Sequence, residues 1–280
     1  MSDPFGALAP SPWQERFRAV AHRLPANYFG RKAASLLLGP AGGRRRRAYD
    51  VAIFGTQRAR LHPHDNICEK RVYLTPHFWD GAERAFLADA ISGFAGGIFH
   101  FVDVGANVGL YTLFARAEAM RAGAALRAVC IEADAEMVAR LQFNLDASNA
   151  ADAVAVFNCA ASDRDATLRL AVNRKSRGLS RIAETGGAPV AARPLLSMIV
   201  EAGLPRIDAL KIDIEGHERA ALGAFFRDAP QRLHPGLLLL EISHADADRA
   251  AERVVLDAGY VERLRTARNA GFVIDRQTPG

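Results

Sequence analysis

The chain has few cysteines. Cys68, Cys130 and Cys159 stand far apart in 280 residues. An odd and widely spaced set excludes a zinc framework of paired cysteine ligands and a dense disulfide scaffold, and it indicates a reducing compartment. Cys130 and Cys159 lie in or beside apolar runs, so we expect both in the core as small apolar residues.

Membrane-spanning and secretory signals are also lacking. No run approaches the ~18 consecutive apolar residues of a membrane span. The first residues, MSDPFGALAPSPWQERF, hold no basic stretch followed by an apolar core, so no secretory signal is visible. We therefore expect a cytoplasmic protein. Half of the residues are apolar and 24% are charged, which fits an ordinary globular enzyme.

Lysine is scarce as well, and arginine supplies nearly all of the positive charge. The net charge is +5, and a basic balance fits anionic partners such as nucleic acid or lipid surfaces. The densest run, Arg44–Arg47, follows two glycines. No zinc-knuckle or aromatic RNA-binding signature accompanies it. We favour a solvated linker over contact with an anionic lipid or glycan, and over RNA, so nucleic acid is not an expected partner.

Residues 1–47 are expected to form an appendage to a domain that spans residues 48–280. Four apolar residues of the appendage recur at helical spacing: Trp13, Phe17, Val20 and Leu24. This stripe favours a face that docks on a partner over a peripheral membrane anchor. Residues 48–75 alternate apolar and polar side chains in places, which predicts a small β-hairpin before the core.

From residue 80 onward, apolar runs alternate with amphipathic segments. We predict helices over 80–95, 108–121 and 134–148, and strands over 99–104, 126–131, 153–158, 207–213, 237–242, 259–264 and 270–275. This alternation indicates the α/β class, with a mostly parallel sheet covered by helices on both faces. Residues 166–193 look less regular, and we expect either a polar loop that contacts the substrate or a solvated excursion.

The most informative stretch is FHFVDVGANVG, residues 99–109. An apolar strand ends in Asp103, and the chain then turns through Gly105, Asn107 and Gly109 into a helix. Gly105 allows a ligand close to the backbone, and Asn107 tolerates a left-handed conformation. The strand-end carboxylate stands where open α/β sheets bind their ligands.

Glu132 ends the next apolar run, LRAVCIE, where a ribose-binding acid is expected. The spacing of Asp103, Gly105 and Gly109 differs from the G-x-G-x-x-G fingerprint, which holds a pyrophosphate. S-adenosylmethionine fits better than a dinucleotide. It offers an ammonium and a sulfonium to Asp103 and a ribose diol to Glu132, and it has no phosphate. A bare loop without a ligand is the alternative.

Three blocks, FVDVGANVGLYTLFA, CIEADAEMVARLQFNL and DALKIDIEGHERAALGAF, resemble the FkbM family of S-adenosylmethionine-dependent methyltransferases. The resemblance covers roughly residues 49–274. It implies a Rossmann-like class I methyltransferase fold, and O-methylation of a hydroxyl on a sugar, glycolipid or natural product. One feature departs from the family, which often has an acid in a TLDS-like stretch where this chain has Leu195 and Leu196.

A second chemical cluster is DALKIDIEGH, residues 208–217. Side chains alternate along a strand, so Lys211, Asp213 and Glu215 share one side. Charges in a buried central strand are costly unless they pair or bind something. We expect an active-site edge here, with a structural ion pair as the alternative. A desolvated Lys211 could also lose its proton.

Glu241 ends the run GLLLLEI, so it would meet Asp213 at one sheet edge if the two strands are neighbours. Two such carboxylates could deprotonate a hydroxyl or hold a divalent cation, although no spacing here specifies a metal. We expect Asp213 with His217 to act as the base. Glu215 and Glu241 would orient them, and Lys211 would bias the charge of Asp213.

Ser162 and Asp163 follow the third strand, and we expect them near the adenine of the cofactor, with a simple turn as the alternative for Asp163. Two other functions stay open. An RNA methyltransferase would need a basic face beside the cofactor pocket. A non-catalytic domain would bind cofactor or carry a partner, and the intact acids Asp103, Glu132 and Asp213 count against it.

Overall fold

Seven strands form the central sheet of the computed structural model, which describes residues 3–171, 181–182, 186–214, 216–242 and 249–274. The strands are β3 (Ile98–Val104), β4 (Ala125–Glu132), β5 (Val154–Asn158), β10 (Ala209–Ile212), β11 (Leu237–Glu241), β12 (Tyr260–Arg265) and β13 (Asn269–Ile274). Their order is β12-β13-β11-β10-β3-β4-β5. All of them run parallel except β13, which is antiparallel to both of its neighbours.

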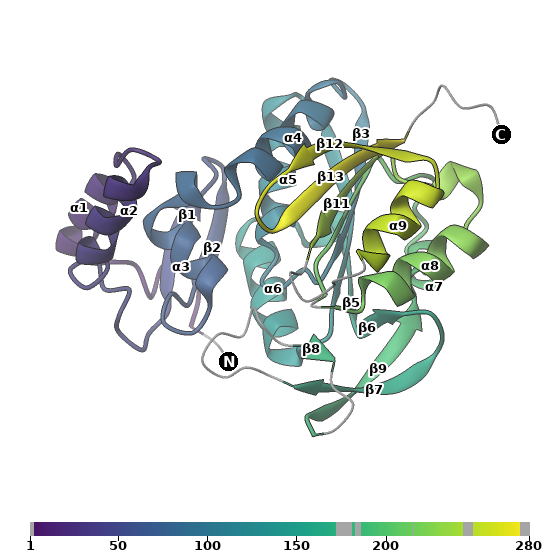
Figure 1. Ribbon diagram of the computed structural model, residues 1–280. Helices are drawn as coiled ribbons and strands as arrows, with labels where there is room; N and C mark the ends of the chain where they lie inside the picture. Colours follow the sequence, from purple (N-terminus) through teal and green to yellow (C-terminus); the bar gives the residue numbers. More distant parts are fainter. Residues whose placement is uncertain (1–2, 172–180, 183–185, 215, 243–248, 275–280) are drawn as a thin grey trace.

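Helices cover both faces of this sheet (Figure 1). One face packs on α4 (Gly81–Ser92), α5 (Leu110–Arg121) and α6 (Ala135–Ala147), and the other packs on α7 (Leu195–Glu201), α8 (Glu218–Asp228) and α9 (Ala250–Asp257). Alternation along the strands divides the core in two. Phe99 and Phe101 of β3 face the first set of helices, while Val102 and Val104 face the second. The predicted α/β class and mostly parallel sheet are therefore confirmed.

A second, smaller sheet corrects the prediction for residues 166–193. Its strands, in the order β6-β9-β7-β8, are β6 (Ala160–Ser162), β9 (Ala188–Pro194), β7 (Ala166–Ala171) and β8 (Arg181–Ile182). The signal was an alternation in β7, where Leu168 and Leu170 point inward between the exposed Thr167 and Arg169. The polar stretch 173–177 lies outside the described residues.

The predicted hairpin is present before the core, although it is shorter than residues 48–75. Strands β1 (Tyr49–Ile53) and β2 (Gln57–Leu61) pair antiparallel. The chain then forms α3 (Ile67–Leu74), which Asn66 caps by accepting hydrogen bonds from the backbone N–H groups of Cys68 and Glu69. None of the helices in the described ranges is long and apolar enough to cross a membrane.

The N-terminal segment forms α1 (Pro12–Ala21) and α2 (Tyr28–Leu37), which lie at the outer end of the molecule in Figure 1. It is tied to the hairpin and α3 by buried polar contacts. The Asp50 carboxylate accepts hydrogen bonds from the backbone N–H groups of Gly6 and Leu8 and forms an ion pair with Arg60 at 2.7 Å. Arg18 donates to the Tyr73 carbonyl at 3.0 Å.

Deleting residues 1–47 should lower the melting temperature but leave ligand binding in the main pocket. The deletion uncovers the buried Tyr49 and Tyr73, whose hydroxyls donate to the carbonyls of Gly42 and Ala41. Among residues 3–67, none lines the pocket described below. Thermal unfolding and calorimetric titration of the truncated chain would check both parts. A truncated chain that stays folded yet binds no cofactor would contradict this expectation.

Candidate functional site

The turn after β3 is left-handed at three positions, as its glycines and asparagine suggested. The φ angles are +72° at Gly105, +51° at Asn107 and +82° at Gly109. A Cβ atom at Gly105 would lie 1.8 Å from the carbonyl oxygen of Asp213. Gly105 is therefore needed because the chain after β10 crosses it closely, a constraint that the sequence did not reveal.

Glu132, at the end of β4, holds this turn in place. Its Oε2 accepts a hydrogen bond of 2.8 Å from the backbone N–H of Asn107, and its Oε1 accepts one of 2.8 Å from Asp134. Burial raises the pKa of Glu132, although both of these amides favour the charged form. On the other side of the turn, Asn66 donates to the side-chain oxygen of Asn107 at 2.8 Å.

Lys211 links the turn to the end of β10 and is 7% exposed. Its Nζ donates to the Gly105 carbonyl at 3.0 Å and lies 3.5 Å from Asp213 and 3.7 Å from Asp103. Burial alone would lower the pKa of Lys211, but the negative charges of Asp213, Asp103 and Glu241 outweigh burial and raise it. These neighbouring acids therefore favour the ammonium form of Lys211 over the neutral amine.

Asp103 lies deeper than the sequence suggested. It is fully buried, and its Oδ2 accepts a hydrogen bond of 2.9 Å from the Thr112 hydroxyl. Burial raises its pKa, against the opposing attraction of Lys211. Asp103 is absent from the residues that line the pocket, and it reaches the site only through its ion pair with Lys211, so direct contact with the cofactor stays a prediction.

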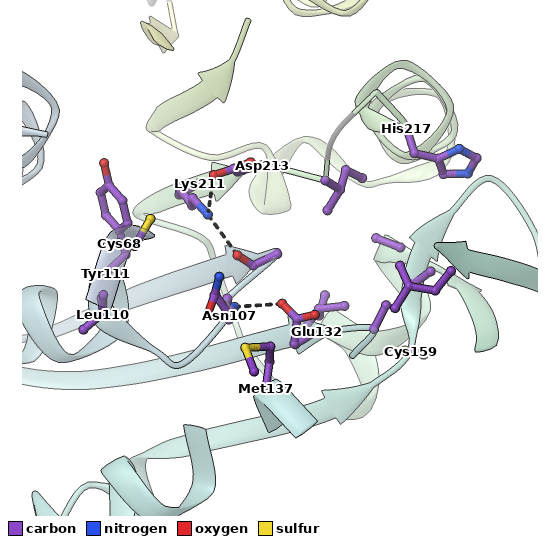
Figure 2. A pocket seen from close by; sticks show the side chains of 18 of the residues that line it. Cys68, Asn107, Leu110, Tyr111, Glu132, Met137, Cys159, Lys211, Asp213 and His217 are labelled. Atoms are coloured by element: carbon purple, nitrogen blue, oxygen red, sulfur yellow. Dashed lines mark hydrogen bonds and ion pairs between the residues drawn. The ribbon is translucent and has the colours of Figure 1, made fainter. Parts of the chain in front are cut away.

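A pocket opens at the carboxyl ends of β3, β4 and β10, where Figure 2 shows Lys211 and Asp213 together above Asn107 and Glu132. The lining residues come from the turn, these strand ends, the second sheet, α3, α5, α6 and the residues just before α4 and α8: Cys68, Trp79, Asp80, Gly105, Ala106, Asn107, Leu110, Tyr111, Ile131, Glu132, Ala133, Met137, Cys159, Ala160, Ala161, Leu170, Lys211, Asp213, Ile214 and His217.

One wall of the pocket comes from residues that the sequence did not single out. The Tyr111 hydroxyl donates to Asp80 at 3.0 Å, and the Tyr111 ring lies 5.0 Å from that of Trp79. Burial and the nearby Glu83 raise the pKa of Asp80, and burial raises the pKa of the Cys68 thiol to about 12. No motif marked Cys68, Trp79 or Asp80, because only the folded chain brings α3 and the residues before α4 against the turn.

His217 lies on another side of the pocket from Asp213. Figure 2 shows it at the start of α8, away from Lys211 and Asp213. Its Nε2 lies 3.1 Å from the Ser162 hydroxyl, which donates to Asp163 at 3.1 Å. The structure thus groups His217 with the two residues that were expected near the adenine. It does not bring His217 to Asp213, as a shared role as base would require.

The remaining predicted residues are placed as follows. Glu241 ends β11, which is the parallel neighbour of β10, so Asp213 and Glu241 do lie at one sheet edge. Glu215 lies outside the described residues. Glu218, which the sequence did not single out, is buried, and its carboxylate accepts hydrogen bonds of 2.9 Å from the backbone N–H groups of Ile214 and Gly216. It fixes the loop that follows Asp213.

The side chains of Cys130, Cys159 and Leu195 are buried. Cys130 and Cys159 lie in the core, as predicted, and Cys159 reaches the pocket wall as well. Leu195, at the position where the resemblance implied an acid nearby, is 1% exposed in the core between the sheet and α7. Within the described part of the chain, no three His, Cys, Asp or Glu side chains are grouped so as to hold a metal ion.

Residues 103–274 match the family model of the methyltransferase FkbM domain. The chain belongs to the FkbM methyltransferase family. The sheet order and its antiparallel β13 give it the class I methyltransferase fold that the resemblance implied. Trp79, Asp80 and the rest of the wall before β3 lie outside the matched residues, so the FkbM match does not account for that side of the pocket.

Solved structures with a similar fold include a methyltransferase FkbM from Methylobacillus flagellatus KT. The two sequences are 17% identical, the match covers 75% of this chain and 55% of that chain, and the TM-score is 0.45. An O-methyltransferase from Bacillus cereus in complex with SAH has 14% identity, covers 69% and 81% of the two chains, and has a TM-score of 0.39. No curated protein matches the sequence. The family match alone carries the assignment.

Proposed function

We propose that this FkbM-family protein is an S-adenosylmethionine-dependent O-methyltransferase that acts on a hydroxyl of a sugar, glycolipid or small natural product. The charge of the pocket carries the proposal. Three carboxylates, Asp80, Glu132 and Asp213, line it, whereas its one lysine, Lys211, is already paired with acids. Such a lining favours a ligand with positive charge and hydroxyl groups, and it disfavours a pyrophosphate.

The cofactor would lie across the turn after β3. Glu132 stands where the ribose diol is expected, and burial strengthens hydrogen bonds to its carboxylate. The backbone of Gly105, Ala106 and Asn107 lines the adjacent wall. His217, with Ser162 and Asp163 behind it, would contact the adenine. Asp103 would act indirectly, by holding the Lys211 ammonium. That ammonium in turn fixes the carbonyl of Gly105 and the carboxylate of Asp213.

Asp213 is the favoured proton acceptor for the attacking hydroxyl. The cofactor supplies an electrophilic methyl group when bound, and the protein must orient an oxygen and remove its proton. The Asp213 side chain lines the pocket and is 39% exposed, so an acceptor can reach it. Lys211 keeps this carboxylate in place at 3.5 Å. Asp80, held by the Tyr111 hydroxyl, supplies a second carboxylate to orient the acceptor.

A small-molecule or glycan acceptor is favoured over RNA by the same lining. Arg44–Arg47 are exposed, but none of them lines the pocket, and the lining offers no unpaired cation to a phosphate backbone.

Incubation with S-adenosylmethionine labelled in its methyl group and fractionated cell extract would test the proposal. Label in a sugar, glycolipid or small-molecule fraction supports it. Label in RNA alone, or no transfer despite cofactor binding, would overturn it.

Glu132→Ala should weaken cofactor binding by about 1–3 kcal/mol, because the ribose hydroxyls and the amides of Asn107 and Asp134 would lose their acceptor. Calorimetric titration of the folded variant with S-adenosylmethionine would measure the loss. Glu136→Ala, an exposed acid four residues along the chain in α6, is the matched control and should bind like the wild type. Equal weakening in both variants would remove the assigned role of Glu132.

A further inference from the structure

Helix α1 buries two polar side chains against the protein and exposes two large apolar ones. Gln14 and Arg18 are 6% and 4% exposed, and they contact Tyr49 and Tyr73 below the helix. Trp13 and Val20, seven residues apart on the opposite side, are 61% and 52% exposed. The stripe noted in the sequence is therefore split, because Phe17 and Leu24 pack partly against the core.

Helix α2 also exposes its large apolar side chains. Its small residues Gly30 and Ala34 face inward and are buried. Phe29 and Leu36, again seven residues apart, are each 78% exposed, and Tyr28 is 63% exposed. Five of the large apolar side chains that this structure exposes therefore belong to two short neighbouring helices, at the left end of the molecule in Figure 1.

The segment that carries these apolar side chains is strongly basic. Residues 1–47 hold nine Arg or Lys side chains against two carboxylates, whereas the rest of the chain holds 27 basic and 29 acidic residues. The whole positive charge of the protein thus comes from this segment. Eight of the nine are exposed: Arg16, Arg23, Arg31, Lys32, Arg44, Arg45, Arg46 and Arg47.

We propose that the outer face of α1 and α2, defined by Trp13, Val20, Tyr28, Phe29 and Leu36, docks on the surface of an anionic lipid bilayer. Aromatic and aliphatic side chains ringed by Arg and Lys are typical of helices that lie in the membrane interface. The apolar residues enter the acyl boundary, and the basic residues meet the anionic headgroups. Neither helix is long enough to cross the bilayer, so the contact is peripheral.

A bilayer fits this face better than a second copy of the chain does. Two copies joined through the face would bring two strongly basic segments together, and like charges at an interface are repelled. An anionic bilayer attracts the same charges. The proposal is independent of the methyl acceptor, because the described part of this segment, residues 3–47, supplies no lining residue to the pocket.

The test uses the full chain and vesicles of neutral phosphatidylcholine, with or without about one third phosphatidylglycerol. The protein should float with the anionic vesicles only, and high salt should release it. Trp13 is a built-in probe, since Trp79, the second of two tryptophans, is buried. The emission of Trp13 should shift to the blue when the anionic vesicles are added.

The double variant Phe29→Ser, Leu36→Ser should reduce vesicle binding by at least about tenfold. Its matched control, Val200→Ser with Leu256→Ser, alters two exposed apolar residues elsewhere and should bind like the wild type. Equal binding by both double variants would overturn the proposal, as would the absence of flotation with anionic vesicles. A dimer in solution that only Phe29→Ser, Leu36→Ser dissociates, without vesicle binding, would instead assign the face to a second copy.

Discussion

Asp213→Asn should lower turnover with the true acceptor by about 10²–10⁴-fold, the usual contribution of a general base. The substitution keeps the shape of the side chain and removes its charge. Cofactor affinity should change little, because Glu132 and the turn after β3 are untouched and Lys211 retains Asp103 as a partner. Steady-state turnover and calorimetric titration of the same preparation separate the two effects.

His217→Ala is the informative companion to this variant. The sequence predicted that His217 shares the role of base with Asp213, whereas the structure pairs His217 with Ser162 on another side of the pocket. We therefore expect His217→Ala to weaken cofactor binding more than turnover.

Treatment of the wild-type protein with EDTA tests whether the carboxylates hold a metal instead. Activity lost to EDTA and restored by Mg²⁺ would assign the carboxylates to a metal. Full turnover by Asp213→Asn would show that this edge is structural.

Lys211→Met should destabilise the protein by about 3–5 kcal/mol, because it leaves the fully buried Asp103 without its cation. Gly105 would also lose the hydrogen bond to its carbonyl. Denaturant unfolding measures the loss, and Lys32→Met, at an exposed position of α2, is the matched control with an effect within about 0.5 kcal/mol.

The pH dependence of this effect has a defined sign. The pKa of Lys211 in the folded protein lies above its ordinary value of 10.5, so its charge stabilises the fold fully at any pH below that value. The stabilisation is lost only as the pH rises through the raised pKa. The difference between wild type and Lys211→Met should stay constant from about pH 7 to about pH 9. A difference that vanishes by about pH 9 would show that Lys211 is not held as a cation.

The sheet was predictable because its central strands are buried on both faces and therefore form near-continuous apolar runs that end in acids. Those strand ends also identified Glu132, Lys211 and Asp213 as residues of one pocket edge. The same reasoning did not place Asp103, because a strand-end position does not say whether a side chain points into the pocket or behind its wall. Here Asp103 is fully buried and accepts a hydrogen bond from Thr112 of α5.

The opposite wall of the pocket could not have been predicted. Cys68, Trp79 and Asp80 come from segments before β3 whose position depends on how α3 and α4 pack on the folded core. No local period or spacing carries that information. The outward orientation of α1 was hidden for a related reason. Its apolar stripe predicted a helix, but only tertiary contacts of Gln14 and Arg18 decide which side faces the protein.

The central claim is that the acid-lined pocket at the end of β3, β4 and β10 holds S-adenosylmethionine. Calorimetric titration of the full-length protein with S-adenosylmethionine, S-adenosylhomocysteine and NAD⁺ tests it most directly. We predict saturable binding of the first two ligands at one site, weakened by Glu132→Ala, and no comparable binding of NAD⁺. Tighter binding of NAD⁺ than of S-adenosylmethionine, or no binding of either methyl-cycle ligand, would contradict the account.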